Sequence, residues 1–334
     1  MEKNMEKLPI GVIGVGHLGG LHAKMFADIP TCTLVGVVDA NSERAQHIPN
    51  ENKTKVFSSA AELLKNVKAV SIATPTSSHY EIARMAIEHG VHLFIEKPIT
   101  QTTEEAETVV QLAKQKELLI QVGHIERFNP ALLALETYNL KPMFIESHRL
   151  AQFNPRGTDV AVVLDLMIHD IDIILSLVRS PVRSIEANGL AVVSDHIDIA
   201  NARLQFENGC VANVTASRIS QNKMRKMRLF QRDAYLSIDF SEGQTEIFRL
   251  IDENEDIPNL TMQLGQIQAG TKNRKIVYER PDTKEVNALK YELELFVDSV
   301  MNGKEPVVSG QDGLQALKVA HDIMEKISRQ RLSL

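Results

Sequence analysis

The chain has 334 residues, of which 43% are hydrophobic and 24% charged, and its formal net charge is −6. This length favours two domains, each with a core of its own, and the composition is typical of a soluble globular protein. The negative net charge argues against nucleic acid as the main partner.

The sequence contains no signal for a membrane or an export pathway. No apolar run approaches the roughly 20 residues that a membrane-spanning helix needs, and the first ten residues, MEKNMEKLPI, lack the apolar segment of a signal peptide. We therefore expect a cytoplasmic protein without a membrane partner. Cys32 and Cys210 have no metal-ligand spacing, which predicts two free thiols and no metal site.

Short apolar strands alternate with amphipathic helices in the first part of the chain. Strands are expected at Ile10–Ile13, Thr33–Val38, Ala69–Ala73, Val91–Ile95 and Leu118–Val122, and the clearest helices at Glu81–Glu88 and Glu104–Lys116. Strands that are apolar at nearly every position imply a sheet covered on both faces. Residues 1–125 are therefore predicted to form a doubly wound parallel α/β domain.

The pattern changes after about residue 125. A helix is expected at Asp159–Leu177, then strands at Ser184–Val193, Ile197–Phe206, Val211–Ser217, Met227–Phe230 and Tyr235–Phe240, and finally helices at Lys284–Met301 and Gln311–Ser328. The polar stretch Asp252–Arg274 is expected to be a loop. Closely spaced strands without helices between them predict an antiparallel sheet, so residues 126–334 should form a second, α+β domain.

A glycine motif directly follows the first strand and begins a helix, with Gly14, Gly16 and Gly19 in the spacing G-x-G-x-x-G. Such glycines let the backbone approach a pyrophosphate, whose charge then lies at the helix N-terminus. The next strand ends in Asp39, the acid that the dinucleotide fingerprint places on the adenosine ribose. These features predict a dinucleotide site.

Asp39 favours NAD over NADP because a carboxylate repels a 2′-phosphate, whereas the nearby Arg44 could soften that preference. The other residues assigned to the cofactor flank the two motifs or follow the next strands. They are His17, Leu18, Ala40, Thr74, Pro75, Thr76, His79, Glu96 and Lys97. For Ser77 and Ser78, a plain helix start with a serine cap explains the sequence equally well.

The residues with catalytic chemistry lie on a later strand and helix. Lys97 ends the strand at the sheet edge where a nicotinamide should lie, and Asp165, His169 and Asp172 have the spacing of one helical face. The acid–histidine–acid stripe is either a structural ion pair or a catalytic group, and Asp170 is expected to be an ordinary exposed acid. Oxidation of an alcohol needs a base near neutral pH, which either Lys97 or His169 could supply.

The motifs GVIGVGHLGGLHA, VVDAN, IATPTSSHYE, FIEKP, VGHIERFNPA and DLMIHDIDI together resemble the Gfo/Idh/MocA oxidoreductases over essentially the whole chain. This resemblance implies NAD(P)-dependent oxidation of a secondary alcohol of a sugar or a related compound to a ketone. It implies that Lys97, Asp165 and His169 lie at the reacting carbon and that Pro98 fixes a turn, for which a cis bond is one solution. It also implies that residues 126–334 bind substrate and form a homodimer or homotetramer through an open sheet.

Within this family, the stretches VGHIERFNPA and SRISQNKMRKMRLFQRDAYLSIDF resemble members that oxidise UDP-N-acetylhexosamines at C3. The resemblance then places His124, Glu126, Arg127 and Asn129 at the substrate pocket. Arg218 and four further basic residues, Lys223, Arg225, Lys226 and Arg228, could attract a diphosphate. A solvated sheet face or a subunit contact explains these five equally well.

Two other functions are compatible with the sequence. One is a dehydrogenase for inositol or a simple hexose, which needs no phosphate-binding arginine. The other is a sensor that binds a dinucleotide without catalysis, although the presence of Lys97, Asp165 and His169 argues against it.

Overall fold

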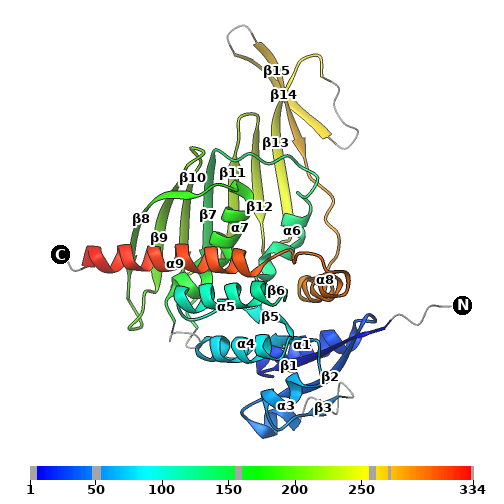
Figure 1. Cartoon of the computed structure of the whole chain (residues 1–334). Coiled ribbons are helices and arrows are strands. Elements are labelled where there is room, and N and C mark those ends of the chain that lie inside the picture. The colour runs from blue at the N-terminus through cyan, green and yellow to red at the C-terminus, as the bar shows by residue number, and fades with distance from the viewer. Residues whose placement is uncertain (1–5, 47–53, 155–159, 256–260, 270–271, 332–334) are drawn as a thin grey trace, which may run out of the picture. The chain divides into compact units, whose positions relative to one another are not determined.

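The computed structural model describes residues 6–46, 54–154, 160–255, 261–269 and 272–331. These residues group into two compact units (Figure 1), the first made of the chain up to Ile125 together with Asn287–Lys318, and the second of Glu126–Val286 together with the chain from Val319 onward. Each unit contains a β-sheet of its own.

The first unit is built on a parallel six-stranded sheet with the order β3-β2-β1-β4-β5-β6. Its strands are β1 (Leu8–Ile13), β2 (Cys32–Val38), β3 (Lys55–Val56), β4 (Ala69–Ile72), β5 (His92–Glu96) and β6 (Ile120–Gly123). This is the strand order of the dinucleotide-binding Rossmann fold. The predicted parallel sheet is confirmed, and the short edge strand β3 was not predicted.

Helices cover both faces of this sheet. They are α1 (His17–Asp28), α3 (Ala60–Leu64), α4 (His79–Glu88), α5 (Thr103–Gln115) and α8 (Ala288–Asn302), with a 3-10 turn η1 (Thr76–Ser78) before α4. On one face, Phe26 of α1, Phe94 of β5 and Phe296 of α8 are buried in one apolar core. On the other, a Cβ atom at Gly11 would lie 2.8 Å from Leu63 of α3, so glycine allows that helix to approach.

The position of α8 differs from the expected division of the chain at residue 125. Leu293, Phe296 and Val297 share the core of the first unit, which is why Asn287–Lys318 belongs to that unit although it follows the second sheet in sequence. The last helix, α9 (Gly310–Arg331), contributes residues to both units. The functional assignments of the two parts stay predictions.

The second unit contains a nine-stranded sheet with the order β14-β15-β13-β12-β11-β7-β10-β9-β8. Its strands are β7 (Phe144–Leu150), β8 (Val182–Leu190), β9 (Ile199–Phe206), β10 (Val211–Ser217), β11 (Met224–Phe230), β12 (Ala234–Asp239), β13 (Gln244–Asp252), β14 (Thr261–Ala269) and β15 (Lys272–Glu279). All pairs are antiparallel except β7 and β10. The predicted antiparallel sheet is therefore confirmed, with one parallel pair in its middle.

The loop expected at Asp252–Arg274 is wrong for the described part of that stretch, while 256–260 and 270–271 lie outside the described residues. β14 and β15 form a hairpin at the edge of the sheet (yellow in Figure 1), with a bulge between Gln263 and Gly265. β14 is the edge strand and its described side chains are mostly exposed, so its sequence lacks the buried apolar positions by which a strand is normally recognised.

Helices contact only one face of the second sheet among the described residues of this unit. α6 (Pro130–Leu133) lies against β12 and β13, and α7 (Ile168–Val178) against β7 and β10. The predicted helix Asp159–Leu177 starts outside the described residues, and its first turn is a π-helical turn, η3 (Val163–Met167), rather than α-helix. Every helix in the described ranges is too short or too polar to cross a bilayer, and the cytoplasmic location stays a prediction.

Candidate active site

The glycine motif forms a sharp turn between β1 and α1. Gly14 has a φ of +84°, and a Cβ atom at Gly19 would lie only 1.8 Å from the Gly14 carbonyl oxygen. At Gly16 an added Cβ atom would meet nothing closer than Arg44, at 3.8 Å. Gly14 and Gly19 are thus required by the fold, whereas Gly16 leaves open space in front of the turn.

The N-terminus of α1 has no capping side chain and no acidic residue in its first turn. His17 and Leu18 begin this helix with exposed side chains. Free backbone N–H groups beside an open glycine are what a pyrophosphate needs, so this part of the structure fits the predicted dinucleotide.

Asp39 lies at the carboxyl end of β2 with its side chain 8% exposed. Its Oδ2 accepts a 2.7 Å hydrogen bond from the backbone N–H of Val15, and its Oδ1 accepts one of 2.8 Å from that of Asn41. Arg44 approaches it to 3.8 Å, and the exposed Ala40 follows it in the chain. The acid is thus fixed against the glycine turn, where the sequence motif requires it.

The loop after β4 contains Thr74, Pro75 and Thr76 and leads through η1 into α4. The Ser78 hydroxyl oxygen lies 2.8 Å from both Thr74 Oγ1 and the Pro75 carbonyl oxygen, but it does not cap the helix. His79 is only 1% exposed, and its two ring nitrogens face backbone carbonyls of Thr74 and Pro98. The ring of His79 therefore contacts the backbone of this loop and not its side chains.

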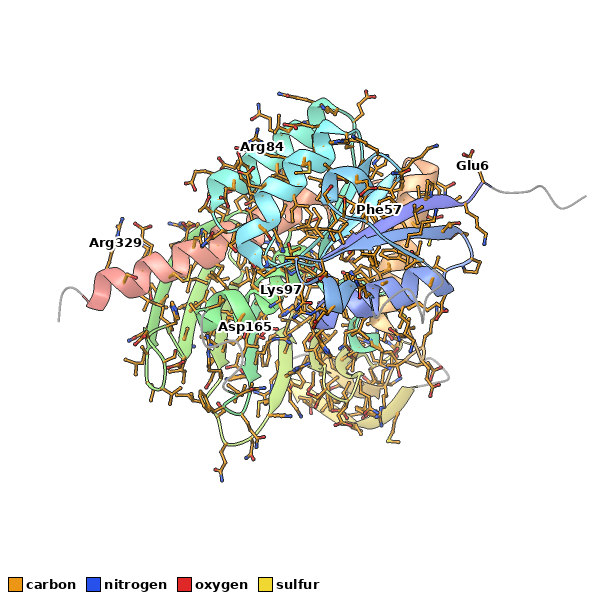
Figure 2. The ribbon with its side chains drawn as sticks, turned by 90° about the horizontal axis from the view of Figure 1, so that it is seen from below. Glu6, Phe57, Arg84, Lys97, Asp165 and Arg329 are labelled. Atoms are coloured by element: carbon orange, nitrogen blue, oxygen red, sulfur yellow. The ribbon has the colours of Figure 1, made fainter. Side chains whose placement is uncertain are left out.

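Lys97 follows directly after β5 (labelled in Figure 2), at the same edge of the sheet as the glycine turn. The Lys97–Pro98 peptide bond is cis, as the resemblance suggested. Glu96 does not point away from the sheet, because its Oε1 lies 3.1 Å from His22 of α1 and its Oε2 accepts a 3.3 Å hydrogen bond from the N–H of Lys97. His22 was not predicted to belong to the site, although a histidine among the apolar residues of α1 is unusual.

In the second unit, Asp165 lies in the π-helical turn η3 and His169 in the first turn of α7, both half-buried (Asp165 is labelled in Figure 2). Single π turns are frequent at functional sites. The third member of the predicted stripe, Asp172, has a different environment: it is 1% exposed and accepts hydrogen bonds of 2.6 and 2.9 Å from Arg127.

Asp170 is buried, so the expectation of an ordinary exposed acid is wrong. Its side chain is 2% exposed and accepts two hydrogen bonds from Arg149 of β7, the shorter at 2.7 Å. Arg149 also donates to Glu126 at 2.7 Å. Burial opposes the charge of Arg149, but the two carboxylates outweigh it and raise the pKa of Arg149 above its usual value.

Three of the four residues expected at the substrate pocket are engaged by polar groups of the second unit. Glu126 contacts both Arg149 and Asn129, Arg127 is paired with Asp172, and Asn129 also caps α6 and donates to the Phe240 carbonyl. His124 is buried directly after β6. These contacts explain why the polar side chains are stable where they lie, and their role toward a substrate stays a prediction.

The five basic residues do not form one cluster. Arg218 is 5% exposed, donates to the Val160 carbonyl and lies 3.6 Å from Asp198. Side chains alternate between the faces of a strand, so Lys226 and Arg228 lie on the face opposite Arg225. Only Arg225, which pairs in register with Arg149 and lies 3.6 Å from Glu126, shares the face that α7 covers, while Lys223 precedes the strand.

Both cysteines are buried and free. Burial raises the pKa of the Cys32 thiol to about 12 and that of Cys210 to about 11. Neither thiol is therefore a reactive nucleophile near neutral pH. Among the described residues, no group of three His, Cys, Asp or Glu side chains is arranged to hold a metal ion.

The Rossmann strand order, the open glycine turn and the acid at the end of β2 are those of a dinucleotide-binding domain. Residues 8–124 match the family described as an oxidoreductase family with an NAD-binding Rossmann fold, and residues 141–245 match the GFO/IDH/MocA C-terminal domain. The chain belongs to the Gfo/Idh/MocA family, as its motifs suggested.

Several relatives resemble the chain over most of its length. It is 44% identical over 239 residues to a UDP-N-acetylglucosamine 3-dehydrogenase of Acidithiobacillus ferrooxidans, covering 71% of this chain and 76% of that protein. A solved structure of the enzyme with that name from the same organism superimposes with a TM-score of 0.86 at 36% identity, covering 97% of this chain and 98% of the other. A scyllo-inositol 2-dehydrogenase (NAD(+)) of Bacillus subtilis is more distant, at 28% identity over 92% of this chain and 90% of that protein.

Proposed function

We propose that the protein oxidises the C3 hydroxyl of UDP-N-acetylglucosamine to a ketone with NAD as the hydride acceptor. The observation that carries the proposal is the 44% identity to a dehydrogenase of that name, well above the 28% identity to an inositol dehydrogenase. The presence of Lys97, Asp165 and His169 in this chain supports an active enzyme rather than a sensor.

The reaction removes a proton from the hydroxyl oxygen and a hydride from the carbon that bears it. The nicotinamide, when bound, accepts the hydride. Lys97 or His169 takes the proton, and Asp165, one π turn before His169, orients the histidine or the substrate hydroxyl. The ketone then leaves with the carbon two electrons more oxidised.

NAD is the proposed cofactor rather than NADP. The Asp39 carboxylate is fixed by two backbone N–H groups at the end of β2, so its negative charge cannot turn away from a 2′-phosphate. Arg44 lies 3.8 Å from that carboxylate and is therefore partly neutralised by it. Fluorescence titration should give a dissociation constant for NADP at least about tenfold above that for NAD, and Asp39→Ser should narrow the ratio.

A second candidate is oxidation of inositol. It is favoured by the dispersal of the basic residues, since Arg218 is buried and Lys226 and Arg228 lie on the face away from α7. Inositol has no phosphate and needs no basic residue for binding.

The experiment that separates the two candidates is the formation of NADH, followed by its near-ultraviolet absorbance. The purified protein is mixed with NAD and, separately, UDP-N-acetylglucosamine, its C6 acid, myo-inositol and glucose. A carbonyl-trapping reagent is added because a 3-keto product can be unfavourable at equilibrium. NADH with UDP-N-acetylglucosamine supports the proposal, NADH with inositol alone supports the second candidate, and no NADH with any of the four compounds despite NAD binding contradicts both.

A second copy of the chain is the proposed partner, through the face of the nine-stranded sheet away from α7. A row of aromatic rings crosses five strands of this face, formed by Phe144, Phe230, Tyr235, Phe248 and Tyr278 with centroids 5.0 to 5.7 Å apart. All five are only half-buried in the single chain. Sedimentation should show a dimer or tetramer, and Tyr235→Lys should shift it toward monomer.

A further inference from the structure

A buried histidine of α1 lies behind the loop that carries Lys97. His22 is 0% exposed, in contact with the ring of Phe94, whose centroid is 5.3 Å from its own. Its Nδ1 lies 2.8 Å from the hydroxyl of Ser71 in β4, and its Nε2 lies 3.1 Å from Oε1 of Glu96. The contact with Glu96 is an electrostatic one at ion-pair distance, without the geometry of a hydrogen bond, whereas the contact with the Ser71 hydroxyl is a hydrogen bond.

Glu96, which lies next to His22, also contacts the backbone of Lys97. Its second carboxylate oxygen accepts from the Lys97 N–H at 3.3 Å. The residue opposite in β6 is Gly123, where an added Cβ atom would lie 2.9 Å from Glu96 Oε1. The sheet thus leaves a space that the carboxylate fills, and Ser71, His22, Glu96 and the Lys97 backbone form a continuous chain of polar contacts.

A second buried histidine holds the other side of the same loop. His79 Nδ1 lies 3.0 Å from the Pro98 carbonyl oxygen, and Nε2 lies 2.9 Å from that of Thr74. Burial lowers the pKa of His79, while the two carbonyls and the charge of Glu96 act in the opposite direction. The neutral ring donates to one of the two carbonyls and packs against the other, so it lies between the loop after β4 and the loop after β5.

We propose that His22 and His79 are positioning residues that clamp the backbone on both sides of Lys97. His22 fixes the residue before the lysine and His79 fixes the residue after it. Each also connects the lysine loop to a part of the cofactor cradle: His22 belongs to the helix that starts at the glycine turn, and His79 contacts Thr74. The inference rests on the proposed catalytic role of Lys97. In that role, the two buried imidazoles position the lysine.

The energetic argument concerns orientation. A lysine has four rotatable bonds, and a displacement of about 1 Å at a reacting group can lower a rate by about 100-fold. A loop held only by its own turn would move the Cα atom of Lys97, whereas two contacts with neighbouring elements restrict it. Loss of either histidine should therefore lower kcat while the glycine turn, which binds the dinucleotide, keeps its shape.

The test compares His22→Leu and His79→Leu with His22→Gln and His79→Gln, in which an amide keeps a polar group facing Glu96 or the carbonyls. The leucine variants should lower kcat about 10- to 100-fold with less than about threefold change in the dissociation constant of NAD. The glutamine variants should recover part of the lost kcat. His92→Leu is the matched control. His92 lies at the opposite end of β5 and accepts from the Leu119 N–H at 3.0 Å, so its loss should affect stability but not kcat.

The decisive measurement places each leucine substitution in the Lys97→Ala background. If the histidines act through the lysine, the double variant should be no more than about twofold slower than Lys97→Ala alone, because the group that they position is already absent. A further loss equal to that of the single substitution overturns the inference, as does unchanged kcat in both leucine variants. Near-normal turnover of Lys97→Ala instead overturns the catalytic role of Lys97, and the two failures are thereby distinguished.

Discussion

The first unit and the second unit both contain ionisable residues in apolar surroundings, but the partners of these residues differ in kind. At the carboxyl edge of the parallel sheet, Glu96 and His79 are fixed by contacts that run to the backbone of Lys97 and of Thr74. On the α7 side of the second sheet, Arg149 and Arg127 are neutralised by acids of the same unit. The contacts in the first unit hold the backbone of the loop that carries Lys97, whereas those in the second unit pair buried charges with one another.

The difference shows that a buried charged residue in a sequence is not by itself evidence for a functional site. A charged residue in an apolar segment marks either a site or an ion pair, and only its partners tell which. Asp170 and Asp172 are separated by two positions of α7 and pair with different arginines, so they fix the rotation of the helix on which His169 lies. Their contribution to function is then indirect, through the stability of the second unit.

The largest expected effect comes from replacing the residues that we place at the reacting carbon. Lys97→Ala and His169→Ala should each lower kcat about 10²- to 10⁴-fold, the usual range for a group that transfers a proton. The dissociation constant of NAD should stay within a few-fold, because neither residue belongs to the glycine turn. Steady-state kinetics and fluorescence titration measure the two quantities, and near-normal turnover in both variants would falsify the catalytic assignment.

The next effect concerns stability rather than turnover. Asp170→Asn leaves the buried Arg149 with Glu126 as its remaining acidic partner, and breaking a buried ion pair in this way costs about 3–5 kcal/mol. The free energy of unfolding in urea should fall by about that amount. Glu325→Gln, which removes the exposed ion pair with Arg329 in α9, is the control and should cost less than about 1 kcal/mol. Equal losses in the two variants would contradict the distinction between buried and exposed pairs.

The buried pair of Arg149 and Asp170 also explains why strand β7 was not predicted from the sequence. Strands such as β10 have apolar residues at every inward position and were predicted with their observed limits. The neighbouring strand β7 was missed, because its inward residues are Ile145, Ser147 and Arg149. A charged residue at an inward position hides the alternation of a strand, and its partner Asp170 comes from a helix 21 residues later.

The candidate site was predictable to the extent that it depends on local motifs. The glycine turn and Asp39 were predicted from residues close in sequence, and a cis bond before Pro98 was one solution that the family resemblance implied; the structure contains all three. The contact between His22 and Glu96 joins α1 to β5, which no local pattern predicts. The division of the basic residues between two faces depends on the register of β11 against β7, and this register could not be predicted from the sequence either.

A smaller effect is expected from a buried carboxylate outside the candidate site. Asp198 is 0% exposed, and its carboxylate accepts from the N–H groups of Val192, Val193 and Ser194 and from the Ser194 hydroxyl. Burial alone would raise the pKa of Asp198, but these hydrogen bonds outweigh it and hold the pKa below its usual value. The carboxylate therefore secures the connection between β8 and β9.

The sign of the pH dependence follows from that lowered pKa. The unfolded chain takes up the proton first, at a pH of about 4, so the stabilisation is complete above that pH and is lost as the pH falls toward the pKa of the folded state. Asp198→Asn should cost about 1–3 kcal/mol at pH 7 and should flatten the decline of unfolding free energy below about pH 4. Asp195→Asn, an exposed acid of the same connection, is the control. An unchanged slope in Asp198→Asn would show that the carboxylate is not held as described.

The smallest effect sharpens the comparison within one strand. If a diphosphate binds on the α7 side of the second sheet, Arg225 can reach it and Arg228, three positions later, cannot, because the two side chains lie on opposite faces. Arg225→Ala should raise the KM for UDP-N-acetylglucosamine about tenfold, since a charge-assisted contact with phosphate contributes about 1.4 kcal/mol or more, and kcat should change little. Arg228→Ala should leave KM within about twofold, provided that sedimentation shows an unchanged oligomer. Equal effects of the two substitutions would mean that the basic residues act through the net charge of the protein and not as a binding site. Effects on neither would leave the sugar and its acetamido group as the source of affinity, and this outcome would favour a site in which Arg225 serves only to neutralise Glu126, 3.6 Å away.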